Sequence, residues 1–372
     1  MMRITDLRPI LLSVPLARPV QTAFGTMTHR HAILVEVVTD EGLVGLGESW
    51  SNFPAWAPAE RLATLTQGVR PLIVGQALDD PARVTQNLIA RLEPVGRQWG
   101  ARGPIFQAIS AVDIALWDVH GKALGKPVRA LLADATADQA PVYASGLGPA
   151  NVVKTARVYW EAGVRTMKLK VGFGAATDRA NLAALCDAYP GAALAVDANQ
   201  AWTYKQARDM APLLREFGCR WMEEPVPAEE LDALRRLRAD LPCLIAGGEN
   251  YYGTREFGRV LAAGALGLAQ PDVCKTGGIT ELAAICRAAH AAGIPYAPHY
   301  LGGAVGLIAS LHVFASLPGG LIMELDANPN PLREDLLTTP PLVHNGMLAV
   351  PDGPGLGIAL NPDTVARYQV VV

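Results

Sequence analysis

The sequence predicts an α/β protein in which repeated strand–helix units form a parallel barrel, preceded by a separate α+β domain. In the second half of the chain, strand-like runs lead into a charged residue or histidine at steps of 27, 26, 26, 23, 27 and 25 residues. The series is Lys170, Asp197, Glu223, Glu249, Asp272, His299 and Glu324. Amphipathic helical patterns separate the runs, as in residues 204–217 and 279–292. A strand, a helix and two short loops occupy about that many residues, so the spacing predicts parallel strands joined by helices.

The first 125 residues follow a different pattern, which predicts the α+β domain. Residues 33–38, Ile-Leu-Val-Glu-Val-Val, are interpreted as a strand, and residues 44–48 return as a second strand after a turn. Helical periodicity follows, and its longest stretch, residues 105–124, is ended by Gly125. We therefore place the domains at 1–125 (α+β), 126–325 (barrel) and 326–372. The last segment is rich in proline and glycine and too long for a loop, so we expect it to pack back onto the first domain.

Two segments near the first strands, residues 22–28 and 49–56, are expected to be loops. The second is rich in aromatic and small residues. A packed surface loop and a lid over the barrel mouth explain this composition equally well. The lid interpretation assigns substrate contact to the following side chains: Phe24, Met27, Trp50, Phe53 and Trp56.

Composition excludes several classes of function. The chain has 372 residues, half of them hydrophobic, a net charge of -3 and no basic block, so nucleic acid is not an expected partner. No apolar run is long enough to span a membrane, and no signal peptide is recognisable, which predicts a cytoplasmic protein. Five scattered cysteines without a Cys-x-x-Cys pair fit a reducing compartment and predict neither disulfides nor zinc. We expect a homo-oligomer that acts on a small carboxylate molecule.

The strand at residues 165–172 carries two lysines that share one face, because residues two apart in a strand point the same way. Lys168 and Lys170 alone would fit a solvated edge strand. In a parallel barrel, however, chemistry lies at the carboxyl ends of the strands. Seven polar residues at successive strand ends therefore predict one shared site.

Three carboxylates, Asp197, Glu223 and Glu249, end consecutive predicted strands. Neighbouring strands lie about 4.8 Å apart, so these groups would repel one another unless a cation lay between them. A set of hard oxygen ligands suits Mg²⁺ or Mn²⁺. Each carboxylate could instead cap a helix, but that explanation is weak for three in register. Asn199 shares the face of Asp197 and could orient ligands.

Asp272 and His299 end the next two strands and are expected to form a dyad, since a neighbouring carboxylate fixes the tautomer of an imidazole and raises its basicity. The alternative for His299 is a hydrogen-bonded core histidine. Glu324, on the eighth strand, could hydrogen-bond a substrate oxygen.

Taken together, these motifs resemble the mandelate racemase branch of the enolase superfamily. The matching residues are Lys168-Leu-Lys170, Asp197-Ala-Asn199, Glu223-Glu-Pro225, Gly248-Glu249, Pro271-Asp272, His299 and Glu324. The resemblance implies a (β/α)7β-type TIM barrel with an N-terminal α+β capping domain that the C-terminal tail completes. It also implies that Asp197, Glu223 and Glu249 bind Mg²⁺.

The resemblance further implies roles for the remaining site residues. Lys170 would be one base, His299 with Asp272 the opposite acid or base, and Lys168 would contact the substrate carboxylate. The tail and the segment 324–333 are most similar to acid-sugar enzymes of that branch, including galactarolactone cycloisomerase-like proteins. One residue departs from this pattern: a lysine at the position of Lys275 is the second base in the muconate cycloisomerase and dipeptide epimerase branch.

The expected chemistry is removal of the proton α to a carboxylate, giving an enediolate. Loss of a β-hydroxyl would make the protein an acid-sugar dehydratase, a lyase. Return of a proton would make it a racemase, an epimerase or a lactone cycloisomerase. A catalytically inactive binding protein would have lost these charged residues, and a metal-dependent aldolase would not need the first domain or two opposed bases.

Overall fold

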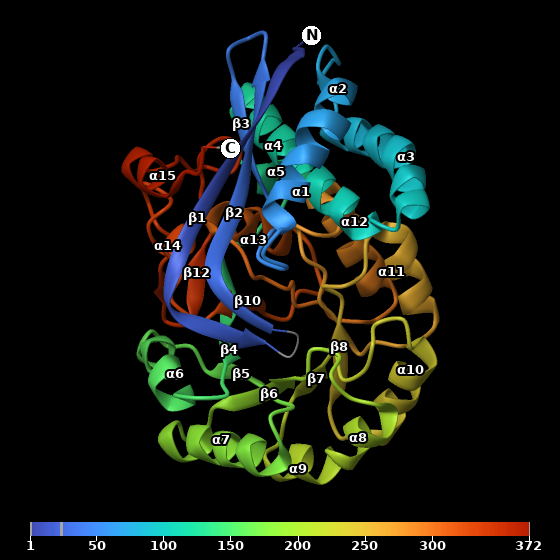
Figure 1. Ribbon diagram of the computed structural model, residues 1–372, viewed down its shortest axis with the longest axis vertical. Coiled ribbons are helices and arrows are strands. Elements are labelled where there is room, and N and C mark those ends of the chain that lie inside the picture. The colour runs from blue at the N-terminus through green and yellow to red at the C-terminus, as the bar shows by residue number, and fades with distance from the viewer. Residues whose placement is uncertain (1, 23–24, 372) are drawn as a thin grey trace.

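The protein was analysed as a computed structural model that describes residues 2–22 and 25–371. Its N-terminal part, called the cap here, joins an antiparallel sheet of three strands to a layer of helices (Figure 1). The strands are β1 (Ile4–Thr22), β2 (Gly25–Thr39) and β3 (Val44–Ser49). The helices are α1 (Ala57–Ala63), the π-helical segment η1 (Thr64–Val69), α2 (Arg70–Ile73), α3 (Pro81–Trp99) and α4 (Arg102–Leu124), followed by α5 (Val128–Leu132).

The predicted strands and long helix of the cap are confirmed, but the predicted loop at 22–28 is wrong. Strands β1 and β2 continue to the tip of one long hairpin, and Met27 pairs with Val20 there. Threonine and valine are frequent on both sides of the tip and favour an extended ladder, which the glycine and the polar residues had concealed. Phe24 lies outside the described residues.

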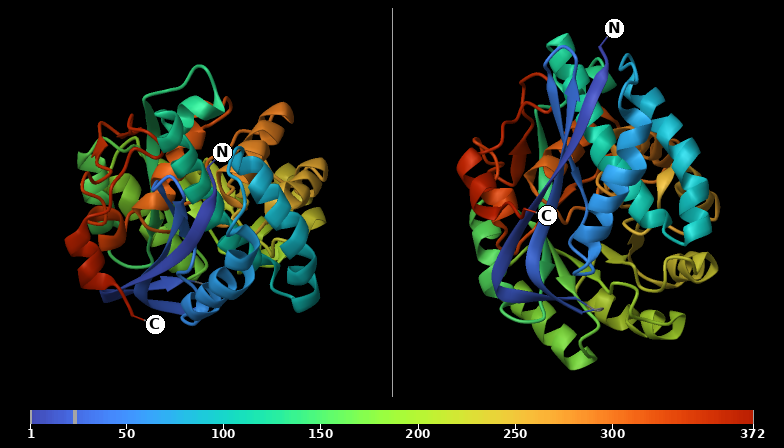
Figure 2. Two further views of the ribbon diagram at one scale, coloured as in Figure 1. Left: turned by 90° about the horizontal axis from the view of Figure 1, so that it is seen from above. Right: turned by 45° about the horizontal axis from the view of Figure 1, so that its top comes forward.

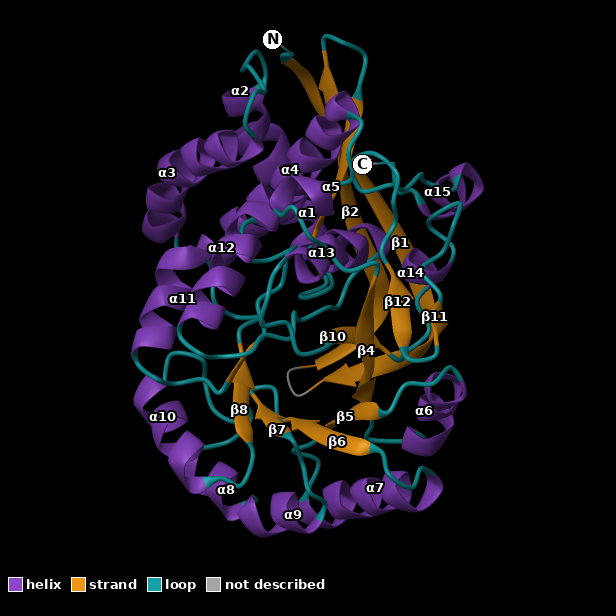
Figure 3. Ribbon diagram, turned by 180° about the vertical axis from the view of Figure 1, so that it is seen from behind, coloured by secondary structure: helices purple, strands orange, loops and turns teal. Residues whose placement is uncertain are grey.

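The barrel has six consecutive parallel strands in the order β4-β5-β6-β7-β8-β9, and β10 pairs with β4 (Figure 3). The strands are β4 (Gln139–Leu147), β5 (Thr166–Lys170), β6 (Ala193–Asp197), β7 (Trp221–Glu223), β8 (Leu244–Gly247), β9 (Leu268–Ala269) and β10 (Met323–Asp326). Single parallel bridges from Ala269 to Tyr296 and from Tyr296 to Gly320 connect the remaining side. Backbone pairing therefore runs around the ring.

Helices follow the strands and cover the outside of the barrel (Figure 3). They are α6 (Val152–Glu161), α7 (Ala175–Ala188), α8 (Tyr204–Asp209), α9 (Ala211–Glu216), α10 (Leu231–Asp240), α11 (Gly253–Ala262), α12 (Gly278–Ala291) and α13 (Ala304–Ser316). Each buries apolar side chains against the strands in one continuous core. The predicted alternation of strands and helices is confirmed.

Helix α4 packs closely on β3 within the cap and on α12 of the barrel with its other side. A Cβ atom at Gly47 would lie 1.9 Å from the carbonyl oxygen of Ala111, so only glycine lets the strand approach the helix this far. On its other side α4 meets α12, where Asp113 accepts hydrogen bonds from Thr280. The two views of Figure 2 show the cap, blue to cyan, lying along the barrel, which is green to orange.

The tail contacts both parts of the molecule. It contains α14 (Pro331–Glu334), β11 (Val343–His344), β12 (Met347–Ala349) and α15 (Pro362–Tyr368). Strand β12 pairs antiparallel with β4, and the amide of Val370 donates to the carbonyl of Leu11 in β1. The tail thus contacts β1 of the cap at this point, while the domain limits at residues 125 and 325 and the assignment of the tail to the cap stay predictions. No helix among residues 2–22 and 25–371 is long and apolar enough to cross a membrane.

Candidate active site

Lys168 is buried inside the barrel, with only 1% of its surface exposed. Its Nζ donates to Glu223 Oε2 at 2.5 Å and lies 2.8 Å from Glu324 Oε1 and 3.8 Å from Asp197 Oδ2. Burial alone would lower the pKa of Lys168, but these carboxylates outweigh burial and raise it well above the ordinary lysine value. Lys168 is therefore a fixed cation at the centre of the site.

Lys170 lies nearer the mouth and faces the end of the next strand. It pairs in register with Asp197, and its Nζ donates to Asp197 Oδ2 at 2.5 Å and to Asn199 Oδ1 at 2.8 Å. The Asn199 amide donates to Asp197 Oδ1 at 2.8 Å, so Asn199 orients the carboxylate as the shared strand face predicted. Lysine 170 retains 20% side-chain exposure, which leaves it accessible from the mouth.

Glu223 ends β7 beside Asp197 on β6, and the two are register partners. Besides Lys168, it accepts a hydrogen bond of 2.5 Å from Gln270 Nε2. Burial raises the pKa of Glu223 to about 7, and the nearby Asp197 carboxylate adds to this increase against the opposing effect of Lys168. The negative charge around Glu223 is therefore not fully balanced, and additional positive charge beside these carboxylates would be favourable.

Glu249 and Asp272 lie in loops just beyond strand ends, since β8 ends at Gly247 and β9 at Ala269. Glu249 Oε2 is 3.1 Å from Lys275 Nζ. Lys275 is buried, and its Nζ lies 4.6 Å from the ring centroid of Trp50. In this structure Lys275 is thus a partner of Glu249 on the same side of the site as His299.

His299 lies between two carboxylates. Its Nδ1 is 2.7 Å from Asp272 Oδ2, and its Nε2 is 3.3 Å from Glu249 Oε2. Burial would lower the pKa of His299, but Glu249, Glu324 and Asp272 raise it to about 9. The Asp272–His299 contact matches the predicted dyad, with Nε2 directed toward the carboxylates of the site.

Glu324 completes the ring of charged groups on β10. It accepts from the Tyr300 amide at 3.0 Å in addition to its contact with Lys168. The charged residues predicted from the strand ends therefore come together in one cluster, with Lys170 at the end of β5 and His299 in the segment between the Tyr296 bridge and α13.

The three candidate metal ligands already have cationic partners in the structure. Each holds an ammonium group: Glu223 holds Lys168, Asp197 holds Lys170, and Glu249 holds Lys275. Among the described residues, no three histidine, cysteine or acidic side chains are gathered tightly enough to form a ready metal centre. The donor set nevertheless fits Mg²⁺, because the oxygen atoms of two buried carboxylates, Asp197 and Glu223, and of the partly buried Glu249 are hard ligands that already bind cationic groups here.

Cap residues reach the mouth from two strands. The Trp50 amide donates to the Cys274 carbonyl, and Asn52 Nδ2 donates to the Leu301 carbonyl at 2.8 Å. Trp50 is therefore at the site, as the lid interpretation requires. Met27 is buried, Phe53 is half-buried and Trp56 is 74% exposed. Closure of these three side chains over a substrate stays a prediction.

Sequence reasoning missed several buried polar groups of the site. Gln270 immediately precedes the Pro271-Asp272 motif, and this position was the only signal for it. Glu48 is buried and accepts hydrogen bonds from the amides of Gly303 and Gly306 at the start of α13. Nothing local in the sequence indicates this contact, because its partners lie about 255 residues away.

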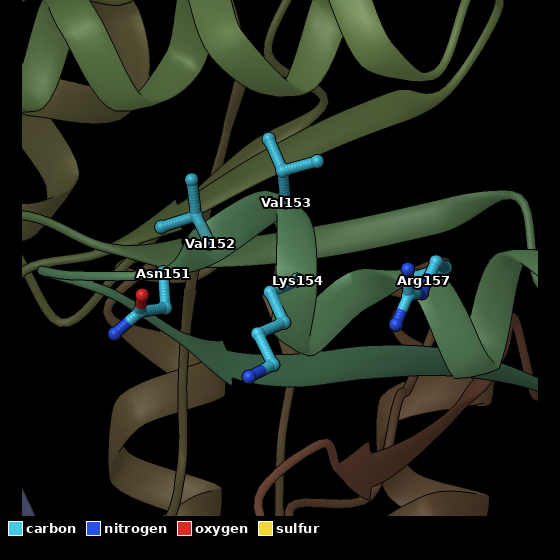
Figure 4. A pocket seen from close by; sticks show the side chains of 5 residues that line it. All are labelled: Asn151, Val152, Val153, Lys154 and Arg157. Carbon is cyan, nitrogen blue, oxygen red and sulfur yellow. The ribbon is translucent and has the colours of Figure 1, made fainter.

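Two surface cavities lie elsewhere on the described part of the chain. One of about 570 Å³ lies at the first turns of α6 and is lined by five residues: Asn151, Val152, Val153, Lys154 and Arg157 (Figure 4). A second, of about 880 Å³, lies between α6, the tip region of the cap hairpin and the loop after β10. Neither contains a candidate site residue, so the chemistry of the buried cluster, not surface shape, identifies the site.

Comparison with known families agrees with this geometry. Residues 7–133 match the family described as the mandelate racemase / muconate lactonizing enzyme N-terminal domain, and residues 151–364 match the enolase C-terminal domain-like family. The chain belongs to the mandelate racemase/muconate lactonizing enzyme family of the enolase superfamily. The fold class predicted from the sequence is confirmed with it.

Three relatives illustrate the range of this family. The chain is 35% identical to D-galactarolactone cycloisomerase of Agrobacterium fabrum over 99% of both chains. It is 31% identical to arabinonate dehydratase of Saccharolobus solfataricus over 91% of this chain and 90% of the relative. A solved structure of an enolase from Bradyrhizobium complexed with magnesium and mandelic acid has a TM-score of 0.85 and 32% identity, covering 100% of this chain and 99% of that one. The protein is an enzyme of the lyase or isomerase type found in this family.

Proposed function

We propose that this enzyme removes the proton α to the carboxylate of an acid sugar and then expels a β-hydroxyl as water, giving a 2-keto-3-deoxy acid. The observation that carries the proposal is the arrangement of Lys170 and the His299–Asp272 dyad about the carboxylates of Asp197, Glu223 and Glu249. Such a site offers two opposed groups for proton transfer and a place for a divalent cation.

We assign Asp197, Glu223 and Glu249 as ligands of Mg²⁺, with Mn²⁺ as an alternative ion. When bound, the ion would supply positive charge that stabilises the developing enediolate. Magnesium in the Bradyrhizobium structure supports this assignment. Asn199 keeps Asp197 oriented through its amide contact.

Lys170 is the proposed base. Its Nζ is the more accessible of the two strand lysines, and a neutral amine there would accept the α-proton. In the present structure Asp197 raises the pKa of Lys170 against the opposing effect of burial. Neutralising the Asp197 charge favours the free amine. Lys168 and Glu324 would hold the substrate carboxylate and an adjoining hydroxyl, respectively.

His299 is the proposed acid. The carboxylates of Glu249, Glu324 and Asp272 raise the pKa of His299, which favours the protonated imidazole, and Asp272 holds the ring at Nδ1. Nε2 can then give its proton to the β-oxygen as the C–O bond breaks, while the electron pair from the α C–H bond forms the C=C bond. The resulting enol becomes the keto acid by taking a proton at the β-carbon.

Lactone cycloisomerisation is the second candidate, because the relative with 35% identity and nearly full coverage is a cycloisomerase. In that reaction, and in epimerisation, the same two groups would move protons without releasing water. Trp50, Phe53, Trp56 and Phe24 are proposed to shield the substrate. Homo-oligomerisation and a cytoplasmic location stay predictions.

The experiment is a screen of acid sugars and their lactones with Mg²⁺ in deuterated water. Dehydration gives a semicarbazide-reactive keto acid. Epimerisation places deuterium at the α-carbon with the β-hydroxyl retained, and cycloisomerisation changes the ring of a lactone without loss of water, which the product mass shows. Every activity should disappear in excess chelator and return with Mg²⁺. Full activity in chelator, or no α-proton exchange with any acid sugar, would contradict the proposal.

A further inference from the structure

The cap places an arginine at the end of the eighth barrel strand. Arg30 on β2 is 1% exposed and forms an ion pair with Asp326 at the end of β10 through Nη2. Ala32 and Leu34 share its strand face and are buried in the core cluster of the barrel, whereas Ile33 belongs to the core of the cap. Arg30 therefore points from the cap toward the barrel.

Asp326 is on the face of β10 that lines the barrel interior. Ile322 packs against the buried apolar residues inside the barrel, and Glu324 contacts Lys168 there. Asp326 is two residues beyond Glu324 on the same strand and therefore points to the same side. Two residues of a strand span roughly 6.6 Å, so Asp326 and its arginine lie about one step above Glu324 at the mouth. The guanidinium of Arg30 is thus beside the proposed substrate site and away from the metal ligands.

Two nitrogens of this guanidinium, Nε and Nη1, are buried and have no hydrogen-bond partner among the described residues. Burying N–H donors without acceptors is unfavourable, so such groups in a binding site commonly serve a ligand. Asp326 already balances the positive charge, and Nε and Nη1 point in different directions. They suit separate neutral oxygen atoms better than one additional carboxylate.

Neighbouring cap residues also have buried polar atoms without a hydrogen-bond partner among the described residues. His31 Nδ1, Ser51 Oγ and Trp50 Nε1 are also buried without partners in the described part of the chain. His31 is tied to the lid segment through its amide, which donates to Asn52 Oδ1 at 3.3 Å. Among the described residues, Ser51 Oγ and Trp50 Nε1 therefore add unsatisfied groups beside the mouth, whereas His31 alternates with Arg30 and lies on the opposite face of β2.

We propose that Arg30 is a specificity-determining residue, which donates hydrogen bonds to hydroxyl or lactone oxygens at the end of the substrate remote from the reacting carboxylate. The inference rests on the proposed function and extends it. It predicts that the enzyme selects long polyhydroxylated acids over short hydroxy acids, because only the former reach the cap.

The test compares wild type with Arg30→Lys, which keeps a cation for Asp326 but removes the guanidinium nitrogens. Isothermal titration with excess Mg²⁺ measures the Kd of six-carbon aldonates and aldarates and of the two-carbon acid glycolate. Arg30→Lys should weaken the best six-carbon acid about 10- to 100-fold and change glycolate less than about threefold. Thermal unfolding checks that the variant is folded.

Arg333→Lys is the matched control. Arg333 is also a buried arginine that contacts Asp326, through its backbone carbonyl, and its two terminal nitrogens both donate, Nη1 to Asp326 O and Nη2 to Glu334 Oε1. It should leave both Kd values unchanged. The proposal is overturned if Arg30→Lys binds long acids like wild type, weakens long and short acids equally, or if wild type binds long acids no better than glycolate.

A second measurement distinguishes failure of the Arg30 proposal from failure of the proposed function. At saturating acid, Arg30→Lys should keep α-proton exchange in deuterated water within about threefold of wild type, with the effect confined to Kd or KM. A large loss of exchange at saturation would contradict a role at the remote end. Absence of exchange in wild type would refute the proposed reaction, while the ratio of Kd values would still decide the role of Arg30.

Discussion

Replacing Asp113 by asparagine should stabilise the protein at pH 8 and have a much smaller effect at pH 5. Asp113 is fully buried in α4 at the contact with α12. It accepts hydrogen bonds from Thr85 Oγ1 at 2.6 Å, from Thr280 N at 2.9 Å and from Thr280 Oγ1. Burial raises the pKa of Asp113 from 3.8 to about 7 despite these hydrogen bonds.

The sign follows from the two pKa values of Asp113. The unfolded chain loses the proton near pH 3.8 and the folded protein only near 7, so stability decreases as pH rises through this window. The full loss is about 4 kcal/mol, of which roughly 2.5 kcal/mol falls between pH 5 and 8. Asparagine does not ionise. Its oxygen can accept from Thr280 N, and its amide can donate to both threonine hydroxyls.

Urea unfolding of Asp113→Asn and wild type at pH 5 and pH 8, both in chelator, measures this difference. The stability advantage of the variant should grow by roughly 2.5 kcal/mol between the two pH values. The control is Asp232→Asn on exposed α10, which should show no pH-dependent difference. A variant less stable than wild type at pH 8 would show that Asp113 is ionised in the folded protein, and the burial argument would be wrong.

Three further predictions follow from the structure. Glu223→Gln should abolish Mg²⁺ binding, measured by calorimetry, and lower kcat at least about 100-fold; tight binding in the variant would contradict the ligand assignment. Gly278→Ala should destabilise the protein by more than about 2 kcal/mol, because its Cβ would lie 2.3 Å from Asp113 Oδ2. Gly293→Ala has a similar positive φ and open space, so an equal loss there would exclude the clash as the cause. Trp50→Ala should lower kcat/KM about tenfold by admitting water to the mouth, and an unchanged value would argue against the lid.

The strand ends could be predicted because their chemistry follows strand periodicity. Lys168 and Lys170 share a face by alternation, and one strand–helix unit later Asp197 is the register partner of Lys170. The same spacing brings Glu223 beside Asp197. Local sequence was sufficient here because a parallel barrel repeats one geometry.

Contacts between cap and barrel could not be predicted in the same way. Arg30 meets Asp326 across 296 residues, and Glu48 meets Gly303 across 255. Such pairs depend on how two folded parts dock, which no periodic pattern encodes. Gln270 was missed for a related reason: β9 is only two residues long, so the alternation that would have assigned its side chain to the barrel interior was too short to detect.

Two residues could be the second proton-transfer group, opposite Lys170. His299 and Lys275 both contact Glu249, so either could face Lys170 across the site. The structure gives His299 a carboxylate partner at Nδ1, whereas Lys275 is stacked near Trp50.

The most direct test measures α-proton exchange and product formation for Lys170→Ala, His299→Asn and Lys275→Ala with one active acid sugar in deuterated water. We predict that Lys170→Ala loses exchange and that His299→Asn keeps exchange but forms no product. Lys275→Ala should retain both within about tenfold. If Lys275→Ala is as damaging as Lys170→Ala while His299→Asn is harmless, the paired lysines catalyse the reaction and the dyad assignment is contradicted.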